Sequence, residues 1–107
     1  MYITKSGLPT TSILDITKDY NYYKQKRLKF RAKVKRVSLN SSIIIVEGYT
    51  NDSFIRIPKK LKSVLEELWE TNNWIDVQIG VEGVPYFCRY RGIVGIKKGE
   101  ILSVVPI

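Results

Sequence analysis

One segment, residues 28–35, constrains the fold of this chain more than any other. Its positions alternate between apolar residues and cations, in the order Leu28, Lys29, Phe30, Arg31, Ala32, Lys33, Val34 and Lys35. Because successive side chains of a β-strand point to opposite faces, this alternation predicts a strand with one buried face and one basic face. Four cations, from Lys29 to Lys35, should then project from the same side of a sheet.

The alternation slips by one residue after Lys35. Arg36 follows directly, and apolar residues resume at Val37 and Leu39. One extra residue in an alternating pattern is typical of a β-bulge, which bends and twists the strand that contains it. We therefore expect residues 28–39 to form one long, bent strand, of the kind that takes part in two sheets of a closed barrel.

The positive charge of the chain is concentrated in the same region. The 107 residues include 18 Lys or Arg and 10 Asp or Glu, which gives a net charge of +8. Residues 18–36 hold nine basic residues and one acidic residue and so carry the whole excess. A basic segment on an otherwise neutral chain indicates a binding surface for a polyanion, with nucleic acid as the first candidate. The other interpretations are an acidic protein or membrane surface and a purely solvating role.

Five further segments follow the period of a strand. They are residues 43–49, 54–57, 74–82, 86–96 and 101–105. Pro58 and the apolar stripe that begins at Leu61 predict a helix over 58–71. Glycines and prolines place turns at 83–85 and 97–99. Residues 1–27 are polar and rich in turn formers, and we expect a lead-in segment with a short strand or turn.

This order of elements resembles the OB-fold, a Greek-key barrel whose helix lies between its third and fourth strands. The stretch from Ser12 to Val37 is also similar to the entry into OB domains of the replication protein A and single-stranded DNA-binding type. We therefore predict a mostly β protein: one OB-like domain over 1–107, a barrel of five to six strands in the order β-β-β-α-β-β(-β). An SH3-like barrel with an inserted helix and other small α+β barrels are the alternatives.

The resemblance implies a ligand on the outer face of the second and third strands. The residues expected there are Tyr49, Phe54 and Arg56, beside the basic strand. Rings that stack on bases and cations that hold phosphates are what a single-stranded nucleic acid requires. The second strand is apolar on both faces, so the N-terminal segment or another subunit is expected to cover one of them.

Two other clusters combine aromatic and basic residues. Phe87, Arg89 and Arg91 share one side of the predicted strand over 86–96 and are further candidates for contact with nucleic acid. Three tyrosines between residues 20 and 23 are interleaved with lysines, and they form either an arm that orders on a ligand or a covering flap.

Several kinds of chemistry are excluded or disfavoured. The chain has no His and a single Cys, Cys88, which rules out zinc sites built from Cys and His as well as Cys–His and Ser–His nucleophiles. No glycine-rich phosphate loop is present. We predict no enzymatic activity, no metal and no cofactor. An unpaired thiol and the lack of a long apolar stretch predict a cytoplasmic protein without membrane insertion. The abundance of Ile, Lys and Tyr fits a thermophile or an archaeal virus.

The predicted function is therefore binding of single-stranded DNA or RNA with little sequence preference. The cations Lys29, Arg31, Lys33, Lys35 and Arg56 would contact phosphates, and Tyr49, Phe54 and Phe87 would stack on bases. The alternative is a protein interaction module, a homodimer or a subunit of a larger complex, that docks on an acidic partner. Binding of duplex DNA is disfavoured, because the predicted helix over 58–71 is balanced in charge.

Overall fold

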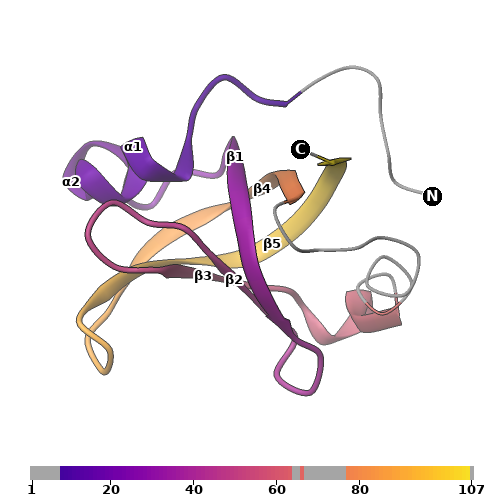
Figure 1. Cartoon of the computed structure of the whole chain (residues 1–107). Coiled ribbons are helices and arrows are strands. Elements are labelled where there is room, and N and C mark those ends of the chain that lie inside the picture. The colour runs from indigo at the N-terminus through magenta and orange to yellow at the C-terminus, as the bar shows by residue number, and fades with distance from the viewer. Residues whose placement is uncertain (1–7, 64–65, 67–76, 107) are drawn as a thin grey trace.

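A computed structural model describes residues 8–63, 66 and 77–106 (Figure 1). Its elements are α1 (Ile13–Lys18), α2 (Tyr20–Tyr23), β1 (Leu28–Ser38), β2 (Ile43–Val46), β3 (Ser53–Arg56), the 3-10 helix η1 (Lys59–Leu61), β4 (Val77–Cys88) and β5 (Ile93–Pro106). The strands close into a barrel in the order β1-β2-β3-β5-β4. The pairing of β3 with β5 is parallel and the other pairings are antiparallel. The predicted fold class, a mostly β, OB-like barrel, is confirmed.

Strand β1 is the long, bent strand that its sequence predicts. Phe30, Ala32 and Val34 are buried in the barrel. The first half of β1 pairs with β4 and the second half pairs with β2, and the register shifts between Val34 and Arg36. The bulge therefore lies where the alternation of the sequence slips. The bulge also changes which side chains point outward. In a regular strand Lys35 would hold the next outward position, and here Arg36 holds it.

Strands β4 and β5 correct the predicted turns at 83–85 and 97–99, because the chain continues as strand through both segments. A Cβ added to Gly83 would lie 2.4 Å from Cγ2 of Ile96, and one added to Gly99 would lie 2.6 Å from Cγ2 of Ile55. These glycines thus mark places where strands pack closely, and register shifts on either side of Val81 absorb the bend. The reversal between the two strands lies at residues 89–92, so the barrel has five strands among the described residues.

The lead-in segment contains two short helices, where a strand or turn was expected. The Oγ of Ser12 caps α1 by accepting a hydrogen bond from the backbone N–H of Leu14, at 3.1 Å. Ile13 and Ile16 are fully buried in the barrel core. Helices α1 and α2 lie on the opposite side of the barrel from η1 (Figure 1). The lead-in is therefore part of the core, since its apolar side chains fill one end of the barrel.

Residues 8–12, the described part of the chain before α1, run along β1 and not over β2, where the N-terminal segment was one of the two covers expected. The backbone N–H of Arg31 donates to the carbonyl of Thr11 at 2.8 Å, and Ser12 and Arg31 form an isolated parallel bridge. In this half of β1 one edge pairs with β4, and the N-terminal segment takes hydrogen bonds on the other edge. It thus satisfies backbone groups that β2 is too short to reach.

The predicted helix over 58–71 begins in the described part of the chain. Pro58 precedes η1, and Lys62 continues with helical backbone angles. The Nζ of Lys62 lies 3.9 Å from a carboxylate oxygen of Glu66, one helical turn further on. Residues 64–65 and 67–71 of the prediction, and the first residues of the strand expected over 74–82, lie outside the described residues. Within the described ranges, no helix is long and apolar enough to span a membrane.

Candidate nucleic-acid interface

One outer surface of the barrel crosses all five strands. Its residues, here called the Phe54 face, are Arg36, Ile43, Ile45, Phe54, Arg56, Tyr86, Arg91, Gly95 and Lys97. The strand register builds most of it, because residues directly opposite each other on paired strands share a face. Ile45 is opposite both Arg36 of β1 and Phe54 of β3. Ile43 is opposite Arg56, and Tyr86 is opposite Gly95.

Phe54 is the centre of this face. Its ring lies over Gly95 of β5, so closely that a Cβ on Gly95 would be 2.5–2.9 Å from three ring atoms. The ring of Tyr86 packs edge-on against it, with the centroids 5.8 Å apart. Phe54 lies on the outer side of the sheet, yet it is only 2% exposed. The side chains of Arg56, Arg91 and Tyr86 contribute to its cover, and a ligand can displace them or stack upon them.

Three cations surround the two rings. The guanidinium groups of Arg56 and Arg91 lie 5.7 and 5.6 Å from the centre of the Phe54 ring. The Nε of Arg56 also donates a hydrogen bond to the Oη of Tyr86, at 2.9 Å. The Nζ of Lys97 lies 5.9 Å from the centre of the Tyr86 ring. These distances are within the range of cation–π contacts, so the rings hold the cations in place.

The charge of these cations is available to an external anion. Among the residues that the structure describes, no carboxylate forms an ion pair with Arg56, Arg91 or Lys97. Arg36 is exposed at the β1 end of the same face. The half-buried side chains of Ile43 and Ile45 lie between Arg36 and Arg56 and add an apolar strip.

The predicted stacking residues Tyr49 and Phe87 meet at a different place. They line one cavity of about 210 Å³ together with Thr17 of α1 and the start of β5. The side chain of Tyr49 is 58% exposed and that of Phe87 is 49% exposed. The backbone N–H of Tyr49 donates to the Oγ1 of Thr17 at 3.0 Å, and the Nζ of Lys18 lies 5.4 Å from the Tyr49 ring. Helix α1 thus positions the loop that carries Tyr49.

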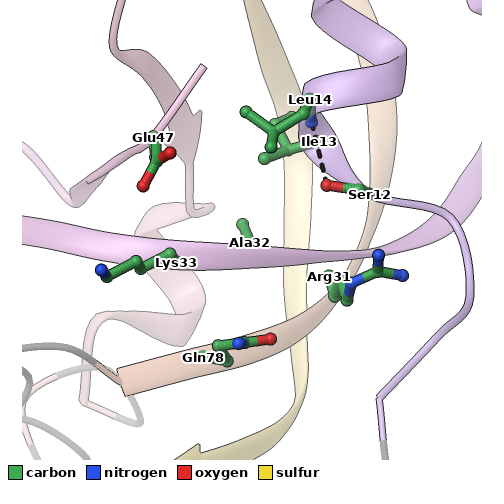
Figure 2. Close-up of a pocket in the computed structure, with 8 residues that line it drawn as sticks. All are labelled: Ser12, Ile13, Leu14, Arg31, Ala32, Lys33, Glu47 and Gln78. Atoms are coloured by element: carbon green, nitrogen blue, oxygen red, sulfur yellow. Dashed lines mark hydrogen bonds between the residues drawn. The ribbon is translucent and has the colours of Figure 1, made fainter. Parts of the chain in front are cut away.

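The basic strand does not present one continuous row of cations to the Phe54 face. Lys29 is opposite Glu82 of β4, and the guanidinium of Arg31 donates to the carbonyls of Pro9 and Thr10 in the N-terminal segment. Figure 2 shows Arg31 and Lys33 extending in opposite directions along β1, around a pocket that Glu47 also lines. Lys35 is exposed beside the bulge. Of the predicted site residues, the structure gathers Phe54, Arg56 and Arg91. Arg89 and Arg91 both lie on the turn at residues 89–92, so the prediction of a single strand over 86–96 is wrong.

Six residues of the Phe54 face were not among the predicted site residues, and three of them, Arg36, Tyr86 and Lys97, carry a charge or a ring. Arg36 could have been identified, since it is the first cation after the slip in the alternation. Tyr86 directly precedes Phe87, so the alternation predicts that the two rings lie on opposite sides of the strand, and Phe87 was the one expected to contact nucleic acid. Lys97 was placed in a turn because Gly99 follows it, and the sequence carries no local signal that would place it on a strand.

A comparison of the chain with models of known protein families and with curated proteins finds no match. The geometry of the barrel and its surface is therefore the basis for any functional inference.

Proposed function

We propose that this protein binds single-stranded nucleic acid on the Phe54 face, largely independently of sequence. The observation that carries the proposal is the arrangement of three cations around two aromatic rings on the outside of a closed barrel. Backbone phosphates pair with Arg36, Arg56, Arg91 and Lys97. Bases stack on the ring of Tyr86 and on the guanidinium planes above Phe54, in the way that aromatic and Arg side chains hold unpaired bases.

Low sequence specificity follows from the kinds of group on this face. Contacts from Lys and Arg to phosphates give affinity but carry no sequence information. Every base has a π-face, so stacking tolerates any sequence. Lys29 and Lys35 on the basic strand add positive potential around the same molecule and favour the approach of a polyanion.

The test is titration of a fluorescent oligonucleotide at increasing salt concentration. Four phosphate contacts predict a log–log salt slope of about −3 for a single strand. The double variant R56E/R91E should weaken binding by more than about tenfold and make the slope less steep by about 1.4, because two contacts are lost. Two variants with the same change in charge serve as controls: K59E/K60E in η1 and K29E/K35E on the basic strand. Equal losses in all three variants would show a general charge effect and contradict the assignment to the Phe54 face.

A second function is favoured by Ile43 and Ile45, whose half-buried side chains form an apolar strip between cations. Such a surface also fits an acidic protein partner or a second copy of this chain. If the wild-type protein binds no oligonucleotide at about 50 mM salt, the nucleic-acid proposal is wrong. Light scattering that then shows a stable dimer would favour the interaction module.

A further inference from the structure

A second basic and aromatic surface lies next to the Phe54 face. It is a cleft of about 550 Å³ between α2 and the hairpin of β4 and β5. The residues that line it are Tyr20, Gln25, Val84, Pro85, Tyr86, Phe87, Arg89, Lys97 and Lys98. Its volume is within the range of about 300–1000 Å³ that is typical of sites for small organic groups. The volume of the cleft is therefore sufficient for a nucleotide.

The cleft contains the same two kinds of group as the Phe54 face. The rings of Tyr20 and Phe87 are 6.3 Å apart between centroids and tilted by 46°, and half of Phe87 is exposed. The cations are Arg89, Lys97 and Lys98. Tyr86 and Lys97 belong to both surfaces, so the cleft continues the Phe54 face without a gap.

The nearest carboxylates along the two strands are already paired. Glu82 precedes Val84 by two residues, and Glu100 follows Lys98 by two residues. Each has an oxygen 3.6 Å from the guanidinium of Arg27, which also donates a hydrogen bond to the carbonyl of Lys98. Within the described part of the chain, no carboxylate lines the cleft. Its potential is therefore positive.

We propose that the cleft is a second binding segment for the same nucleic acid strand, an inference that rests on the proposed function. The strand leaves the Phe54 face at Tyr86 and Lys97 and enters the cleft beneath α2. There Phe87 and Tyr20 stack on a base, and Arg89 and Lys98 hold the phosphates on either side. Helix α2 thus takes part in binding as one wall of the path.

The experiment measures the affinity of oligothymidylates of about 4 to 16 nucleotides, the span of site sizes that one such barrel covers. Two variants alter the cleft: F87A removes a stacking ring, and R89E/K98E reverses two charges. Y22A, which removes an exposed ring of α2, and K59E/K60E are the matched controls. Circular dichroism verifies that each variant is folded.

Short oligonucleotides that occupy only the Phe54 face should bind the cleft variants as tightly as the wild type. Long ones should bind F87A about 5- to 140-fold more weakly, the equivalent of one stacked base. Losses of affinity that are equal at every length, or no loss at all, would contradict binding in the cleft and leave the proposal for the Phe54 face unaffected. A wild-type protein that binds no oligonucleotide of any length would overturn both.

Discussion

At the scale of the residue, Phe54 and Gly95 depend on each other. The ring occupies the space in which any side chain at position 95 would lie. G95A should therefore push the ring outward and lower the free energy of unfolding by about 1–3 kcal/mol, as overpacking does. Urea denaturation measures the change. In an F54A background the same substitution should cost less, since the clashing atoms are gone, and equal costs in both backgrounds would contradict the contact.

The displaced ring has a functional consequence as well. Arg56 and Arg91 rest on Phe54, so a shifted ring moves both guanidinium groups from their present positions. The position of the cations is thus decided by a glycine on another strand. The contacts that pack Phe54 against Gly95 therefore also position the cations of the proposed site.

At the scale of the element, the seam between β3 and β5 closes the barrel. Ile55 of β3 is paired with Ile96 of β5. The hydroxyl of the buried Ser53 donates a hydrogen bond to the carbonyl of Val94 across the seam. S53A removes this bond and should lower the free energy of unfolding by about 1–2 kcal/mol, because the partly buried carbonyl of Val94 loses its partner. Hydrogen exchange at Ile55 and Ile96 should become faster. The exposed Ser41 is the control, and an S41A variant that is equally destabilised would contradict the explanation.

Helix α1 is the second element whose role can be tested. Ile16 is completely buried in the barrel core, whereas Leu14, two residues earlier, is 37% exposed. I16A should lower the free energy of unfolding by about 2–5 kcal/mol, as large-to-small changes in a core do. L14A should change it far less. Thermal unfolding that gives the same midpoint for I16A and the wild type would show that α1 is detached from the core.

At the scale of the whole molecule, the barrel presents rings and cations on its surface. Stacking on Tyr86 requires a base that is free of its neighbours, which a duplex does not offer. Helices α1 and α2 have six and four residues and are too short to read a major groove. Duplex DNA should therefore compete for the labelled single strand at least about tenfold less well than unlabelled single strand, mass for mass. Equal competition would contradict stacking and leave only phosphate contacts.

Several features of the whole molecule follow from local pattern. Alternation and its slip after Lys35 predicted the extent of β1, its buried residues and its bulge, because a strand with one buried face must repeat every two residues. Pro58 predicted the helical turn at η1. The glycines at 83 and 99 predicted turns where the chain forms strand, because a glycine serves equally in a turn and under a neighbouring side chain. Only the partner strand decides between these roles.

Periodicity and charge are properties of adjacent residues, so the amino-acid pattern alone predicts a mostly β barrel around one long, bent, basic strand. The tertiary structure decided where the cations act. Its bulge and pairings turned Arg36 towards Phe54, directed Arg31 to the N-terminal segment and placed Glu82 opposite Lys29. It also brought Arg56, Tyr86 and Lys97 together from three strands. Contacts between residues so far apart in the chain depend on strand order and register, which no local pattern contains.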